Sequence, residues 1–262
     1  MTQGSRAPAR RTARTIEHLL KGTEMPTLGI IGSGNIGSAI ARLAVAAGMN
    51  VVIANSRGVD SLQGLVAELG PLAKAGTVEE AASLGDAVVL SIPLAAVEDL
   101  PAGLLQGKIV LDTSNYYPSR DGRIAELDNG SKTTSELVQE LLGGARYVKA
   151  FGNILAHHIP LLARPSGAPD RTTLPIASDD ARLKAEAAAL IDLLGFDTLD
   201  AGTLADSWKF EPESAGYTRI YLADQSTPDQ ELMSSVPAPT PADRVKAALD
   251  SATRVNVAER AF

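Results

Sequence analysis

The strongest chemical signal in the sequence is a glycine-rich loop with the pattern GxGxxG. Its residues are Gly32, Ser33, Gly34, Asn35, Ile36 and Gly37. In a dinucleotide-binding loop the first glycine makes a tight turn, the second lets the backbone approach a pyrophosphate, and the third lets a helix pack closely. The helix that starts here offers free N–H groups and a partial positive charge to phosphates. The loop therefore predicts a site for a dinucleotide.

The sequence around the loop supplies the elements that such a site requires. The apolar run Thr27–Ile31 predicts a strand before the loop, and Ile36–Ala47 predicts a helix after it. A second apolar run, Asn50–Ala54, predicts the next strand at the expected spacing. This context favours a nucleotide site over a chance glycine-rich turn.

The end of that second strand selects the cofactor. NAD enzymes place an acidic residue there, which accepts hydrogen bonds from the ribose 2′-hydroxyl. This sequence has Asn55, Ser56 and Arg57 instead. Asparagine does not repel a 2′-phosphate, serine can donate a hydrogen bond to it, and arginine forms a charge-assisted contact with it. We therefore predict NADP(H) rather than NAD.

Further residues with suitable chemistry end two later strands. Ser91, Ile92 and Pro93 end one predicted strand, and Ser114 and Asn115 follow the next. In doubly wound sheets the carboxyl ends of strands border the ligand crevice. We expect the first group to lie against nicotinamide and the second to bind its ribose or amide, although ordinary turn chemistry explains each single residue equally well.

Few other residues are suited to catalysis, and we assign no catalytic residue. Tyr116 and Tyr117 come next to the predicted crevice, where they either wall the site or cover the end of the sheet. Asn153 and His157 are candidates for orienting a ligand. His157 and His158 are adjacent and point to different faces of a helix, so they do not form a chelating pair. The chain has no cysteine, which excludes cysteine-ligated metals, and we expect no metal site at the histidines either.

Alternating strand and helix patterns predict an α/β fold with a doubly wound, mostly parallel sheet and a small C-terminal cap. Thr77 and Glu80 form a capping-box pattern at the start of one helix. The predicted strands are residues 27–31, 50–54, 72–75, 87–92, 108–112, 146–150, 173–177 and 196–200, and the predicted helices are 36–47, 61–69, 95–105, 135–142 and 179–194.

Composition limits the partners. The net charge of −7 argues against nucleic acid, because phosphate neutralisation needs a basic surface. No apolar run reaches the roughly 18 to 20 residues that span a bilayer, and the N-terminal stretch has no apolar core of a secretory signal. We therefore expect a cytoplasmic protein that contacts neither nucleic acid nor membrane.

The chain divides into four predicted parts. Residues 1–24 are Arg-rich and predict a disordered tail, and residues 25–150 form the dinucleotide-binding Rossmann domain. Residues 151–225 form the small cap, or substrate region. Residues 226–262 comprise a Ser-rich, Pro-rich and Thr-rich linker up to Pro241 and a weakly helical segment from Ala242 to Arg254, which docks on this domain or on a partner subunit.

Residues 27–224 resemble the NADPH-dependent coenzyme F420 (5-deazaflavin) reductase family, and part of the pattern is shared with the reductase domain of the STEAP ferric reductases. The matching stretches are residues 29–37, 55–57, 91–93, 112–122, 134–137, 148–151 and 200–202, with Trp208. The resemblance implies a homodimer with NADPH bound at the glycine loop. It also implies direct hydride transfer between the nicotinamide and a small redox acceptor, a deazaflavin or a flavin, which the protein stacks and orients.

Two other functions remain open at this point. One is an NADPH-dependent reductase of small imines or carbonyls, although the residues after 200 look too few and too polar for the helical dimerisation domain of such enzymes. The other is a non-catalytic module that senses NADPH. It predicts tight binding without turnover.

Overall fold

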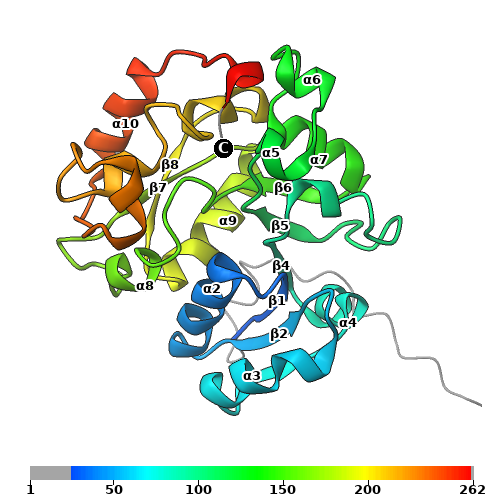
Figure 1. Ribbon diagram of the computed structural model, residues 1–262. Coiled ribbons are helices and arrows are strands. Elements are labelled where there is room, and N and C mark those ends of the chain that lie inside the picture. Colours follow the sequence, from blue (N-terminus) through cyan, green and yellow to red (C-terminus); the bar gives the residue numbers. More distant parts are fainter. Residues whose placement is uncertain (1–24, 261–262) are drawn as a thin grey trace, which may run out of the picture.

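The computed structural model describes residues 25–260 and is organised around a six-stranded sheet (Figure 1). All neighbouring strands are parallel, in the order β3-β2-β1-β4-β5-β6. The strands are β1 (Thr27–Ile31), β2 (Asn50–Ala54), β3 (Ala73–Ala75), β4 (Ala87–Leu90), β5 (Ile109–Asp112) and β6 (Arg146–Lys149). The predicted doubly wound α/β fold is confirmed. The tail predicted over residues 1–24 lies outside the described residues.

Helices cover both faces of this sheet. α2 (Asn35–Ala46) and α3 (Gln63–Leu69) lie on the path from β1 to β3, whereas α4 (Val78–Leu84) leads back past β1 to β4. Because parallel crossovers are right-handed, this reversal places α4 on the opposite face from α2 and α3. α7 (Thr134–Leu142) joins β5 to β6, and α9 (Ala181–Leu193) contacts both of those strands. The crevice at the reversal lies beyond the carboxyl ends of β1 and β4.

The capping box that starts α4 is formed as predicted. The Thr77 backbone N–H donates to Glu80 Oε2 at 2.9 Å, and the Glu80 N–H donates to Thr77 Oγ1 at 3.2 Å. Two otherwise unpaired N–H groups are thereby satisfied at the helix start.

A second, smaller unit forms the C-terminal part. β7 (Thr173–Ile176) and β8 (Asp197–Asp200) pair in parallel, and α10 (Ala242–Ser251) packs beside them (Figure 1) through Val245 and Leu249. The predicted terminal helix therefore docks on its own domain. The remaining helices are short: α5 (Pro118–Asp121), α6 (Ala125–Asp128), α8 (Ile159–Leu162), η1 (Val59–Leu62), η2 (Leu94–Ala96), η3 (Leu204–Phe210), η4 (Thr218–Tyr221), η5 (Asp229–Ser234) and η6 (Val257–Glu259).

The helix predicted over Ala95–Leu105 is wrong. Only the 3-10 turn η2 forms there, and a series of turns follows it. Pro101 supplies no N–H for a helix and disfavours helical backbone in the residue before it. Gly103 then takes a positive φ of 72°. The apolar residues of this stretch pack without helical periodicity, and the turns carry Asp99 to the rim of the crevice.

The segment 226–241, interpreted from its composition as a linker, packs against the C-terminal unit. The Ala223 N–H donates to Val236 O and the Ala238 N–H donates to Tyr221 O, both at 2.9 Å. Thr240 is fully buried. Apart from the short 3-10 helix η5, this Ser-rich and Pro-rich segment satisfies its backbone groups through neighbouring segments.

None of the helices formed by residues 25–260 is both long and apolar enough to span a bilayer.

Candidate active site

The three glycines of the loop serve different purposes. Gly32 has a φ of +110°, and a Cβ on it would lie 2.0 Å from Ser91 O. A Cβ on Gly37 would lie 2.0 Å from Gly32 O, so helix α2 could not approach the loop. Gly34 differs because no atom lies within 4 Å of its Cβ position. The fold requires the outer two glycines, whereas the middle one leaves open space at the start of α2.

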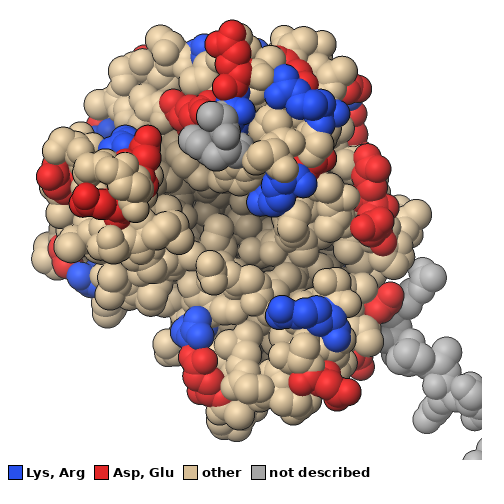
Figure 2. Space-filling model, in the orientation of Figure 1, with Lys and Arg blue, Asp and Glu red and all other residues tan. Residues whose placement is uncertain are grey.

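That space continues into a groove formed by two adjoining cavities. They measure about 450 and about 320 Å³ and share Gly34, Ser91, Ile92 and Pro93. Figure 2 shows a mostly uncharged hollow near the middle of this face. The first cavity is also lined by Ile31, Gly32, Ser33, Asn55, Ser56, Arg57, Val78, Ala96, Asp99, Leu100 and Pro101. The second cavity is also lined by Asn35, Ile36, Thr113, Ser114, Asn115, Tyr117, Arg120, Gly152, Ile154, Leu155, Ala156 and Tyr217.

Every cofactor-binding residue predicted from the sequence lines this groove except Gly37, which packs behind it. At one end Asn55 holds the turn after β2. Its Nδ2 donates to Ser33 Oγ at 2.9 Å, and its Oδ1 accepts from the Arg57 N–H at 3.0 Å. Asn55 thus ties the glycine loop to the turn that carries Arg57, and the Arg57 side chain stays exposed beside the cavity.

At the other end Ser114 and Asn115 are nearly buried. Ser114 Oγ donates to Asp112 Oδ1 at 2.7 Å, and Asn115 Nδ2 donates to Gly152 O at 2.7 Å. Asn115 Oδ1 is buried and has no hydrogen-bond partner in the described part of the chain. A buried amide oxygen left unpaired is costly, so this atom marks a position where a ligand can donate a hydrogen bond.

A buried ion pair supports this end of the groove from below. Lys149 Nζ lies 3.2 Å from Asp112 Oδ2, and both side chains are fully buried. Tyr147 donates its hydroxyl to the same Asp112 oxygen at 2.6 Å. Burial and the Asp112 carboxylate hold the pKa of Tyr147 well above its usual value. A Cβ on Gly152 would lie 3.1 Å from Lys149 Cε, so a larger residue there would crowd this pair.

A pair of tyrosines walls the second cavity. The hydroxyls of Tyr117 and Tyr217 lie 2.7 Å apart, although the residues are 100 positions apart in sequence. Burial raises the pKa of Tyr217, so its hydroxyl stays neutral. Of the two tyrosines noted in the sequence, Tyr117 therefore lines the groove. Tyr116 is buried and donates its hydroxyl to Asp128 Oδ1 at 2.9 Å.

The two orienting candidates are next in sequence to residues that line the second cavity, but they make contacts elsewhere. Asn153 is fully buried, and its Nδ2 donates to Gly216 O at 2.8 Å and to Tyr221 Oη at 3.0 Å. His157 Nε2 lies 3.2 Å from Ser235 O. Neither residue lines either cavity. Their contacts hold the C-terminal unit together.

Sequence reasoning missed several groove residues. Arg120 lies in the stretch 112–122 that carries the family resemblance, but no role was assigned to it. Tyr217 comes from a segment that no motif marked, and Asp99 comes from the stretch wrongly predicted as a helix. The available signals were the pair Tyr116–Tyr117 and the matching stretch 112–122 around it. Among residues 25–260, no group of three or more His, Cys, Asp or Glu residues is arranged to hold a metal ion.

Comparison with known proteins agrees with this geometry. Residues 27–116 match the family described as "NADP oxidoreductase coenzyme F420-dependent". A hypothetical protein from Sinorhizobium meliloti is 35% identical, with a TM-score of 0.59 over 70% of this chain and 88% of that one. The chain belongs to this oxidoreductase family.

Two further proteins resemble this chain at lower sequence identity. The metalloreductase STEAP3 of Rattus norvegicus is 30% identical over 190 residues, which are 72% of this chain and 36% of the relative. The chain thus spans little more than a third of that curated relative. A protein from Arthrobacter sp. FB24, provisionally assigned as an F420-dependent NADP-reductase, is 22% identical with a TM-score of 0.58 over 70% of this chain and 87% of that one. At that identity the likeness shows the fold alone.

Proposed function

We propose that this member of the NADP oxidoreductase family transfers a hydride between NADPH and a deazaflavin or flavin-like acceptor. The observation that carries the proposal is the composition of the second cavity. It adjoins the nucleotide cavity and offers aromatic and apolar walls, yet no carboxylate, histidine or lysine is among its lining residues.

The residues present fit NADPH at the first cavity. The open space at Gly34 and the N–H groups at the start of α2 suit a pyrophosphate. Ser56 and Arg57 would hold the 2′-phosphate in the first cavity, and the unpaired Asn115 Oδ1, where the second cavity adjoins it, would accept from the carboxamide. NADPH bound in this way supplies the hydride. This assignment makes Asn55 an organiser of the loop rather than a direct ligand.

The second cavity suits a planar acceptor. Leu155 and Ala156 lie on one segment, and Tyr117 and Tyr217 are joined through their hydroxyls. Transfer of a hydride between two rings needs stacking and alignment more than acid–base groups, because the rings carry the redox chemistry. The side chains here would hold the acceptor ring against the nicotinamide and exclude water.

One observation favours a second candidate, an NADPH-dependent reductase of small imines or carbonyls. Tyr117 and Tyr217 line the cavity, and their hydroxyls lie 2.7 Å apart. A neutral hydroxyl could give a proton to a substrate nitrogen or oxygen as the hydride arrives. This candidate depends on that proton, whereas reduction of a deazaflavin does not require a protein donor.

The test begins with titration of the purified protein with NADPH and NADH, followed by mixing with oxidised coenzyme F420, FMN or a cyclic imine. Loss of NADPH absorbance with F420 or FMN alone would support the first function. Oxidation with the imine alone, abolished by Tyr217→Phe, would support the second. Tight NADPH binding with no oxidation would leave a sensing role, and absence of NADPH binding would overturn all three.

The assembly and location of the protein are also proposals. The family resemblance supports a homodimer, which light scattering of the purified protein would measure. A cytoplasmic location follows from the expectations of composition, and fractionation of cells would test it.

A further inference from the structure

Arg120 is the only ionised side chain among the residues that line the second cavity. It comes from α5, directly after the strand-end loop of β5, and its side chain is 43% exposed. The proposed function leaves this residue without a role. A cation at the edge of an otherwise neutral cavity attracts an anionic group in any ligand that enters.

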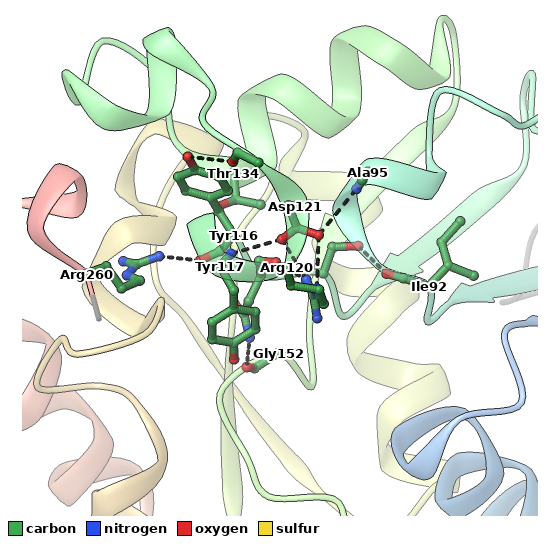
Figure 3. A network of polar contacts seen from close by, with 12 residues as sticks. Ile92, Ala95, Tyr116, Tyr117, Arg120, Asp121, Thr134, Gly152 and Arg260 are labelled. Carbon is green, nitrogen blue, oxygen red and sulfur yellow. Dashed lines mark hydrogen bonds and ion pairs between the residues drawn. The ribbon is translucent and has the colours of Figure 1, made fainter. Parts of the chain in front are cut away.

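The guanidinium is held in one orientation (Figure 3). Its Nε and Nη2 donate to the Asp121 carboxylate at 2.9 and 2.8 Å, and Nη2 also donates to Asn115 O at 2.8 Å. Its Cζ lies 4.7 Å from the centre of the Tyr117 ring. Asp121 is itself fixed, because its side chain is buried and accepts from the Tyr117 N–H at 2.9 Å. A ligand that binds here therefore does not have to immobilise a flexible arginine.

The same contacts leave one edge of the guanidinium uncommitted. Nη1 forms no hydrogen bond within the described part of the chain, although Nε and Nη2 are both engaged. A purely structural arginine would be explained by Asp121 and Asn115 alone. That explanation does not account for its place in the lining of the cavity, against the tyrosine that walls it.

We propose that Arg120 binds an anionic group, phosphate or carboxylate, on the acceptor whose ring lies against Tyr117 and Tyr217. This inference rests on the proposed function and specifies the acceptor further: a planar redox ring with an anionic tail. Arg120 would then select among acceptors that share one ring. The ring itself would be recognised by the tyrosines and by the apolar wall.

FMN and riboflavin test this directly, because they share one ring and differ in a phosphate. Their binding to the NADP⁺-loaded protein is measured by quenching of flavin fluorescence. We expect the wild type to prefer FMN by about tenfold or more, the effect of a charge-assisted hydrogen bond. Arg120→Gln should abolish the preference, because it weakens the binding of FMN and leaves the binding of riboflavin unchanged. Arg120→Lys should retain part of the preference because the charge remains.

Arg123→Gln is the matched control. Arg123 is three positions further on, pairs with Asp128 and donates to Ala258 O, and does not line the cavity. This variant should keep the FMN preference, and all variants should keep the wild-type affinity for NADPH.

The outcomes separate the inference from the proposed function. Equal weakening of FMN and riboflavin by Arg120→Gln would show that Arg120 only positions Tyr117. Weakened NADPH binding would place Arg120 at the cofactor instead. Either result overturns the inference and leaves the proposed function standing. Failure of the wild type to bind FMN, riboflavin or coenzyme F420 would overturn the acceptor class, and the inference with it.

Discussion

The two ends of the groove are built in different ways. The nucleotide end, the first cavity, which we propose binds NADPH, is organised by short loops after β1, β2 and β4, within residues 31–101. The acceptor end, the second cavity, which we propose holds the acceptor, joins segments that are far apart in sequence. Tyr117 contacts Tyr217, and Arg260 donates to the Tyr116 carbonyl across 144 positions. The structure of the nucleotide end can therefore be predicted from local sequence motifs, and single substitutions within those motifs should disrupt it. The acceptor end depends on tertiary contacts and can be disturbed from a distance.

The largest loss of stability is expected from a substitution in the glycine loop, at the nucleotide end. Gly32→Ala places a Cβ 2.0 Å from a backbone oxygen at a φ of +110°. We expect it to lower the free energy of unfolding by more than about 4 kcal/mol, because neither backbone can yield cheaply. Chemical denaturation followed by circular dichroism measures this change.

Gly34→Ala is the matched control, since its Cβ meets no protein atom. It should change stability by less than about 1 kcal/mol, the usual difference between Gly and Ala at a helix N-cap. It should nevertheless weaken the binding of NADPH, because the methyl group occupies the space assigned to the pyrophosphate. Normal NADPH affinity in Gly34→Ala would contradict that assignment.

The next effect concerns cofactor choice at the same end. Arg57→Ala removes one charge-assisted hydrogen bond to the 2′-phosphate, worth about 1.5–3 kcal/mol, so NADPH should bind roughly 10- to 150-fold more weakly. NADH lacks this phosphate and should bind as before. Isothermal titration with both cofactors measures the difference. Equal weakening of both would show that Arg57 does not read the phosphate.

The same contrast explains what could be predicted from the sequence. β1 and β2 have the predicted bounds, because a buried parallel strand is an unbroken apolar run. The glycine loop and Arg57 were found because their spacing along the chain is itself the signal. Tyr217 carries no such signal, and the recognised stretch 112–122 does not single out Arg120. The role of each residue depends on which distant segments meet, and packing decides that.

The errors have the same physical origin. The stretch after Pro93 is rich in Ala and Leu, which favours a helix locally, but Pro101 and Gly103 break it. The segment 226–241 looks like a linker because it is polar, although its backbone is bound by the C-terminal unit. Asn153 and His157 are not among these errors: both form hydrogen bonds within the C-terminal part, and their orienting role stays a prediction.

A third prediction tests the long-range control of the acceptor end. The Arg260 side chain is 1% exposed; Nη1 donates to Tyr116 O at 2.6 Å and Nη2 to Pro212 O at 3.1 Å. It thereby links the segment before Tyr117 to the segment before Tyr217. Arg260→Met leaves these carbonyls unpaired and should cost about 1–3 kcal/mol of stability.

Arg260→Met should also raise the KM for the acceptor while the Kd for NADPH stays unchanged. Steady-state kinetics and cofactor titration separate the two. Arg254→Met in the same C-terminal stretch is the control, because Arg254 is exposed and only approaches the Trp208 ring, at 5.9 Å. If Arg260→Met weakened the binding of NADPH and of the acceptor equally, the two ends of the groove would not be structurally independent.

The smallest effect is a dependence of stability on pH. His158 is buried, with Nε2 3.0 Å from Ser235 O and with Nδ1 lacking a hydrogen-bond partner in the described chain. Burial lowers the pKa of His158, and neighbouring His157 lowers it further, against the opposing effect of the Ser235 carbonyl. Below the ordinary histidine pKa of about 6.5, the unfolded chain therefore binds a proton more readily than the folded chain does. This contribution to stability is present above that pH and is lost as the pH falls.

The slope for one proton is at most about 1.4 kcal/mol per pH unit. Urea unfolding at pH 7.5 and 5.5 should show a loss of stability that His158→Gln reduces and His157→Gln retains, since His158 is intact in the latter. Because His158 and Ser235 join α8 to the segment after η5, the loss belongs to the C-terminal unit. Acid should therefore weaken acceptor binding before it weakens NADPH binding. The reverse order would place the pH-sensitive contact at the nucleotide end and remove the distinction between the two ends.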